Sequence, residues 1–122
     1  MKLENMSEFY FKSSVCTDKN QSERLLALGL KKETADCYLF EYEKGKYKVI
    51  VEPWEDLIAD EEYYLQYKDI CFPAWSLYRL LAMLTTKRKV MLIRFEADLY
   101  DVLIDKIEHE IKEGYFNKEY LV

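Results

Sequence analysis

Residues 72–84 read FPAWSLYRLLAML and carry the clearest helical signal in the chain. Ser76 is a favourable N-cap residue, and leucines follow it at the helical spacing of positions 77, 80, 81 and 84. Trp75 and Leu80 stand at the two positions that form a hydrophobic staple around such a cap. Pro73 indicates a boundary just before them. The stretch predicts a helix over about 76–86, with Trp75 as a structural residue at its start.

A second amphipathic helix is predicted over 98–113. Its apolar residues recur every four positions, and Gly114 stands where a left-handed residue ends a helix. The repeating apolar positions are Leu99, Leu103, Ile107 and Ile111. On its outer face, Glu108 and Lys112 have the favourable spacing of an ion pair, and Asp105 precedes His109 by one turn. These charges need no catalytic explanation.

The chain on either side of these helices carries weaker signals. After the first helix, Lys89 to Phe95 (KVMLIRF) predicts a buried strand. After the second, the tail GYFNKEYLV is rich in apolar residues, which predicts that it docks on the core or on a second copy of the chain.

The N-terminal half predicts short elements. Ser22 and Gly29 delimit a short helix, and Thr34 caps a second helical segment that continues to Tyr42. The alternating run KYKVIVE predicts a strand that ends before Pro53. The sequence also predicts a connecting loop or short turn over 54–60, a strand over 63–68 that pairs with KYKVIVE, and a strand or arm with an aromatic cluster over about 1–20.

Together these signals predict one α+β domain over residues 1–122. A small antiparallel or mixed sheet is expected to pack against the two main helices, with short helices towards the N-terminus. A chain of 122 residues, half of them hydrophobic, is long enough to bury a core.

The charge balance excludes one class of function. The net charge of −5 is unlike that of a nonspecific nucleic-acid binder, and Lys87-Arg88-Lys89 is a short basic run beside a helix end. Carboxylates recur in a stretch that is either a solvated loop or a face for a basic partner. They are Glu52, Glu55, Asp56, Asp60, Glu61 and Glu62.

Residues that could support catalysis or bind a metal are sparse. Cys16, Cys37 and Cys71 lack metal-ligand spacing, and His109 is the single histidine, so we assign no catalytic, cofactor or metal site. No export signal or membrane span is recognised, so a cytoplasmic setting is expected, with reduced thiols that pack as small core residues.

The surplus of aromatic residues favours an interaction surface. With 11 Tyr, 6 Phe and 2 Trp, some rings are expected to face water or a partner, although half-buried structural positions would also explain them. Trp54, Tyr63 and Tyr67 flank the acidic stretch, and Tyr120 lies in the apolar tail, so these four are the candidate interaction residues.

Two segments carry a resemblance to a known group. They are LLALGLKKETADCYLFEY at 25–42 and FPAWSLYRLLAML at 72–84. The matching positions are Leu28, Gly29, Thr34, Ala35 and Asp36, then Pro73, Trp75, Ser76 and Leu77. In this order the chain resembles small uncharacterised proteins of bacterial phages and mobile elements. The resemblance implies a bacterial intracellular setting and no particular chemistry.

Three functional hypotheses follow. The first is a non-enzymatic protein-interaction domain, as a homodimer or with another protein, that offers an aromatic and acidic surface. The second is an acidic inhibitor or immunity-like protein that masks a basic partner. The third is a small-molecule or enzymatic pocket between the sheet and the C-terminal helices, with Trp54, Tyr63 or Tyr67 at its mouth.

Overall fold

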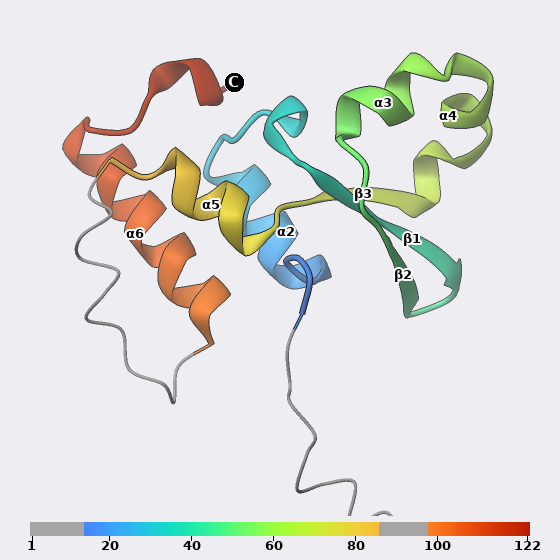
Figure 1. The fold of residues 1–122 in the computed structure, drawn as a ribbon, viewed down its shortest axis with the longest axis horizontal. Helices are drawn as coiled ribbons and strands as arrows, with labels where there is room; N and C mark the ends of the chain where they lie inside the picture. The colour runs from blue at the N-terminus through green and yellow to red at the C-terminus, as the bar shows by residue number, and fades with distance from the viewer. Residues whose placement is uncertain (1–13, 86–97) are drawn as a thin grey trace, which may run out of the picture.

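A computed structural model describes residues 14–85 and 98–122 of the chain (Figure 1). Its helices and strands are, in order, α2 (Lys19–Ala27), η1 (Lys32–Thr34), β1 (Cys37–Glu43), β2 (Lys46–Ile50), α3 (Trp54–Ala59), α4 (Glu61–Tyr67), η2 (Lys68–Ile70), β3 (Cys71–Ala74), α5 (Leu77–Met83), α6 (Leu99–Glu113) and η4 (Lys118–Tyr120). A small sheet combined with several helices confirms the predicted α+β class.

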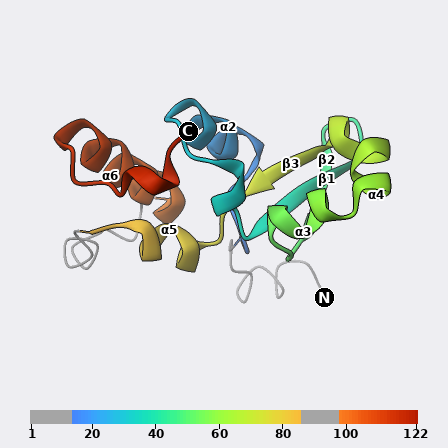
Figure 2. The ribbon, with the colours of Figure 1, turned by 90° about the horizontal axis from the view of Figure 1, so that it is seen from above.

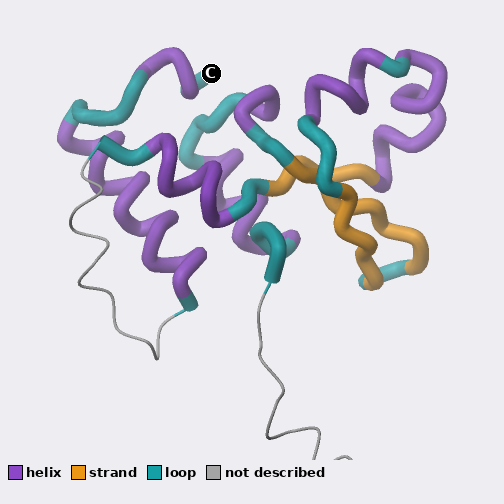
Figure 3. Tube along the Cα trace, viewed as in Figure 1, coloured by secondary structure: helices purple, strands orange, loops and turns teal. Residues whose placement is uncertain are grey.

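The sheet of the described ranges has three antiparallel strands in the order β2-β1-β3 (Figure 3). Tyr38 and Phe40 of the central strand β1 face the main core, while Cys37 and Leu39 face a smaller cluster on the opposite side. Because both faces of β1 are covered, the strand needs apolar residues at successive positions rather than at alternate ones.

Figures 1 and 2 show two ends of the molecule. Helices α2, α5 and α6 gather at one end, and the sheet with α3 and α4 lies at the other. The helical end is held by fully buried side chains that belong to one core cluster, among them Leu25, Leu80 and Ile104. Trp75, also fully buried, leads from β3 into α5 and so joins the two ends.

The two predicted main helices are confirmed by their caps. The Ser76 hydroxyl accepts a hydrogen bond from the Arg79 N–H at 3.1 Å, as expected for the N-cap of α5. In α6, the Asp98 carboxylate caps the N-terminus, and Gly114 ends the helix at a φ of 81°. That left-handed conformation carries a steric cost for residues with a Cβ, which explains the glycine.

The N-terminal helix starts earlier than predicted. Its N-cap is Asp18 rather than Ser22, and the Gln21 side chain completes a capping box. Ser22 lies inside α2, where its buried hydroxyl is 2.8 Å from that of Thr17. Ser22 is a favourable cap residue by type. The better cap, Asp18, lies within the predicted arm.

Three predicted elements between residues 34 and 68 have the wrong type. The segment from Thr34 to Tyr42 forms η1 and then the strand β1, not a helix. The segment 63–68 forms most of α4 and the start of η2, not a strand, and 54–60 contains α3 rather than only a loop. The predicted strand before Pro53 is confirmed as β2, and its partner is β1.

A third strand was missed because it contains a proline. Pro73 lies inside β3, opposite Tyr38 of β1. Proline cannot donate a ladder hydrogen bond, but β3 is an edge of the described sheet and tolerates it. The predicted strand at 89–95, the basic run at 87–89 and most of the predicted N-terminal arm lie outside the described residues.

The apolar C-terminal tail docks on the chain's own core. Phe116 is buried, and Leu121 forms a bridge with Leu30. The backbone N–H of Lys31 donates to the Tyr120 carbonyl at 2.8 Å, and the N–H of Val122 donates to the Gly29 carbonyl at 2.8 Å. The sequence predicts that the tail docks either on the core or on a second copy of the chain. The structure places it on the core of its own chain.

Candidate protein-interaction surface

Helices α3 and α4 are built so that their apolar residues face the sheet. In α3, Trp54 and Leu57 are buried at helical spacing, and the Trp54 N–H donates to the Ala35 carbonyl at 3.1 Å. In α4, Tyr64 packs edge-on against Trp54, with 6.0 Å between ring centres. The opposite faces of both helices are therefore left to the charged residues.

The acidic residues of this region are all exposed, and together they form what we call the acidic surface. Its members are Glu52, Glu55, Asp56, Asp60, Glu61 and Glu62. Residues 49–67 contain these six carboxylates and no Lys, Arg or His. Since the whole chain has a net charge of −5, the remaining residues together carry +1, and the negative charge is concentrated here.

Local structure explains part of this charge. Glu55 and Asp56 lie in the first turn of α3, and Glu61 and Glu62 in the first turn of α4, where acidic groups complement the helix N-terminus. Asp60 caps α4 and accepts from the Tyr63 N–H at 3.3 Å. Across residues 14–85 and 98–122, however, none of the six carboxylates takes part in an ion pair.

Aromatic rings join the acidic surface to the sheet. Tyr63 and Tyr67 are half-buried, and their rings contact each other at a tilted angle with 4.7 Å between ring centres, while Tyr67 contacts Phe40 of β1 at 5.4 Å. Burial raises the pKa of Tyr38 to about 12 and also raises that of Tyr63. Leu65 of the same helix has 60% of its surface exposed. An exposed leucine thus lies among carboxylates.

The four candidate interaction residues are not at one site. Tyr63 and Tyr67 lie together at the acidic surface, as expected. Trp54 is only 3% exposed and packs in the core, so its predicted loop position is wrong. Tyr120 packs against Phe116 in the C-terminal tail, and Figure 1 shows this tail beside α6, away from α3 and α4.

A groove of about 840 Å³ lies between α2, η1 and the C-terminal tail, and Trp54 is not among its lining residues. It is lined by Leu26, Leu30, Lys31, Lys32, Glu33, Thr34, Glu119 and Val122. Its lysines are accompanied by glutamates, so it does not present one sign of charge. The pocket hypothesis placed Trp54, Tyr63 or Tyr67 at a mouth between sheet and C-terminal helices, and this groove is elsewhere.

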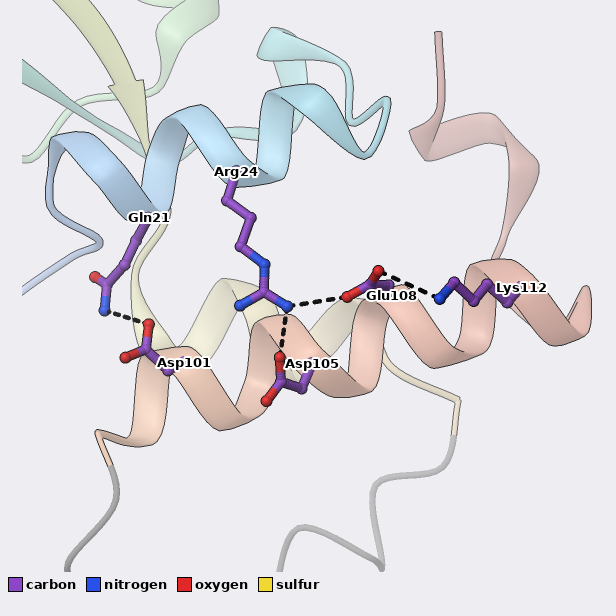
Figure 4. A network of polar contacts seen from close by, with 6 residues as sticks. All are labelled: Gln21, Arg24, Asp101, Asp105, Glu108 and Lys112. Atoms are coloured by element: carbon purple, nitrogen blue, oxygen red, sulfur yellow. Dashed lines mark hydrogen bonds and ion pairs between the residues drawn. The ribbon is translucent and has the colours of Figure 1, made fainter.

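The carboxylates of α6 have structural partners (Figure 4). Arg24 of α2 donates to Asp105 and to Glu108, the latter at 2.9 Å, and Lys112 lies 3.5 Å from Glu108. Gln21 of α2 donates to Asp101 at 3.0 Å in the same row. The predicted Glu108–Lys112 pair is confirmed, while Asp105, expected to pair with His109, instead bonds Arg24. This row fastens α2 to α6.

Sequence reasoning missed a polar junction between the two segments that carry the resemblance. Trp75 donates its indole N–H to the Thr34 hydroxyl at 2.9 Å, and Ser76 donates its backbone N–H to the Asp36 carboxylate at 2.8 Å. Both motifs are visible in the sequence, but no local pattern indicates that they contact each other. Their contact explains these residues as structural.

The cysteines and the potential metal ligands are the remaining groups that bear on chemistry. All three cysteines are buried free thiols, as expected for small core residues. Over the described ranges, no three His, Cys, Asp or Glu side chains gather as a metal site would require, and no helix has the length and apolarity needed to cross a membrane.

Comparison with known proteins adds no relative: no protein-family model, no curated protein and no solved structure matches the chain. The resemblance to phage and mobile-element proteins stays a prediction.

Proposed function

We propose that this chain is a non-enzymatic protein-interaction domain whose acidic surface binds a basic partner protein. The observation that carries the proposal is the concentration of six exposed carboxylates on α3, α4 and the residues just before them, none of which forms an ion pair within residues 14–85 and 98–122. Surface charges of one sign raise the local potential and accelerate the encounter with an oppositely charged partner. The first turns of two short helices do not by themselves require so many carboxylates.

The same surface offers an apolar anchor. Leu65 is exposed and stands in the sequence between the carboxylates of the first turn of α4 and Asp69, and the half-buried tyrosine pair belongs to the same helix. Interfaces commonly combine an apolar centre with a charged rim that sets orientation and rate. The partner surface expected here has lysines or arginines around an apolar recess.

The setting is part of this proposal. Buried reduced cysteines suit a cytoplasmic compartment, and the resemblance of the two motifs suggests a bacterial one. The inhibitor hypothesis shares the acidic surface and differs in what binding does. If the partner is an enzyme with a basic active site, its activity falls when this chain binds, whereas a scaffold leaves that activity intact.

The test compares two triple variants that remove equal charge. Glu55→Gln/Glu61→Gln/Glu62→Gln neutralises the acidic surface, and Glu33→Gln/Glu113→Gln/Glu119→Gln neutralises exposed glutamates elsewhere. Each protein is immobilised, exposed to bacterial cytoplasmic extract, and the bound proteins are quantified by mass spectrometry. A basic protein that binds the wild type and the control, but not the acidic-surface variant, is expected.

The association kinetics of that purified protein provide the second readout. The acidic-surface variant is expected to lose roughly tenfold or more in association rate at low salt, and the difference should shrink as salt is added. Equal binding by both triple variants would contradict the proposal, because it would show that this surface is not used.

A further inference from the structure

The outer edge of β2 is open in the described part of the chain. In the order β2-β1-β3, β2 pairs with β1 on one side, and no described residue pairs with its other side. Such an edge presents a row of N–H and C=O groups that can bind another strand. The question is which strand fits it.

Pro73 identifies the backbone groups that point outward. Because proline has no N–H, its pair with Tyr38 is not a hydrogen-bonded one, so the N–H and C=O of Tyr38 turn towards β2 and meet Ile50. The direction in which the backbone N–H and C=O groups point alternates from one residue to the next along a strand. The backbone groups of Val49 therefore point to the open edge, as do those of Tyr47, two residues earlier; Val51 directly follows the end of β2 at Ile50.

The side chains of Tyr47 and Val49 lie on one face of the sheet. Val49 pairs with Leu39 and Tyr47 contacts Phe72, which places them on the side away from α3 and α4. Val49 is 39% exposed and Val51 68% exposed. Two β-branched residues thus stand uncovered beside an unpaired edge, an arrangement that a neighbouring strand would bury.

We infer that a second copy of this chain pairs with that edge, antiparallel, with the twofold axis at Val49. The two Val49 residues then exchange backbone hydrogen bonds, and Tyr47 does the same with Val51 of the second copy. Lys46 comes to lie opposite Glu52 of the second copy. The two sheets join into one of six strands, and the apolar side chains form a continuous strip.

Charge and hydrogen bonding select this register over its neighbours. A twofold axis at Lys48 would set two lysines directly opposite each other, which is unfavourable. An axis at Ile50 would set Tyr47 opposite Pro53, which has no N–H to give. Lysines on an edge usually oppose pairing, but with the axis at Val49 each Lys46 meets a carboxylate. Within one chain, Lys46 pairs with Glu43 at 3.0 Å.

This inference is independent of the basic partner and is tested on the protein alone. Sedimentation velocity over a wide concentration range should show a monomer–dimer equilibrium. Val49→Lys should raise the dimer dissociation constant about tenfold or more, which corresponds to a loss of about 1.4 kcal/mol or more in binding free energy. Tyr78→Lys, which changes an exposed aromatic residue of α5, should leave it unchanged. A chain that stays monomeric throughout overturns the inference.

The register has its own test. Lys46→Glu and Glu52→Lys should each weaken the dimer, and the double variant should recover it, because the exchanged charges face each other again. Diamide should cross-link Val49→Cys across the axis, while Val51→Cys, although more exposed, should not cross-link to itself. Equal cross-linking of the two variants, or no recovery in the double variant, overturns this register.

Discussion

The indole nitrogen of Trp75 lies 2.9 Å from the hydroxyl oxygen of Thr34 and donates a hydrogen bond to it. The Thr34 hydroxyl in turn donates to the Lys31 carbonyl at 2.6 Å. The Trp75 backbone N–H is also satisfied, by the hydroxyl of Thr17 at 3.1 Å. A fully buried tryptophan thus has both of its N–H groups bonded to threonines from distant segments.

Removing the Thr34 hydroxyl should destabilise the fold. We expect Thr34→Val to lower the free energy of unfolding by about 1–3 kcal/mol, because the buried indole N–H loses its acceptor. Thr34→Ser keeps the hydroxyl and should cost less. Urea unfolding followed by tryptophan fluorescence measures both, with Glu33→Gln as an exposed neighbour expected within about 0.5 kcal/mol of the wild type. Equal stability of Thr34→Val and the wild type would show that the bond contributes nothing.

The parts of the fold that the sequence predicts are those with local signals. Helix α6 combines an Asp98 cap, apolar residues every four positions and Gly114 at its end, and each signal acts within a turn or two. Strand β1 has no such signal. Its segment CYLFEYE lacks a clean alternation because both faces are covered, and Thr34 resembles a helix cap although its hydroxyl serves Lys31 and Trp75.

In helix α4, the preference of its residues for strands is outweighed by an N-terminal cap. Its tyrosines favour strands, and this led to the predicted strand over 63–68. Asp60, however, caps the segment, and Tyr63 and Tyr67 at i and i+4 share one side of a helix turn. Tyr63 and Tyr67 therefore lie on one helix beside the acidic stretch, and Trp54, predicted on a loop, begins helix α3.

Glu110 of α6 is expected to be the most sensitive carboxylate. It is fully buried, and both of its oxygens accept from the Thr85 N–H, at 3.1 and 3.0 Å, just after α5. Glu110→Ala should lower the free energy of unfolding by about 3 kcal/mol or more, because it removes the acceptor of the Thr85 N–H and leaves a cavity at a fully buried position. Denaturant unfolding checks this, and Glu113→Ala on the exposed side of α6 is the control. Similar losses in both variants would contradict the assigned role.

The docked tail should stabilise the monomer. Phe116→Ala is expected to cost about 3–5 kcal/mol because it removes a buried ring from the core. The exposed Tyr115 next to it should tolerate Tyr115→Ala with little change. Thermal unfolding with parallel sedimentation separates the possibilities. A Phe116 variant that changes only the dimer equilibrium, with unfolding unaffected, would mean that the ring serves an interface instead.

The three thiols should be inert in the folded protein. Burial is the main cause that raises the pKa of Cys16 to about 12 and those of Cys37 and Cys71 to about 11. The thiolate is the reactive form, so alkylation by iodoacetamide should remain slow even near pH 9, where exposed thiols are largely ionised. Mass spectrometry with and without urea measures it. Rapid native labelling of any one thiol would show that its segment opens locally.

The pH dependence of stability should report the ion pairs between α2 and α6. Arg24 first, and then Lys112, hold the pKa of the Glu108 carboxyl below its usual value of 4.5. The unfolded state therefore binds the proton more readily. The stabilisation is fully present above about pH 4.5 and is lost as the pH falls through the lowered value in the folded state. Glu108→Gln should accordingly lower the melting temperature at pH 7.

The gap between the wild type and Glu108→Gln should narrow as the pH falls below about 4.5, and added salt should also reduce it at pH 7. Circular dichroism melts from about pH 7 to about pH 3 measure this gap. Glu113→Gln is the matched control, since Glu113 is exposed on the same helix and no ion pair involves it in the described ranges. A Glu108 gap that stays constant down to pH 3 would show that Arg24 holds the helices by packing of its side chain, not by charge.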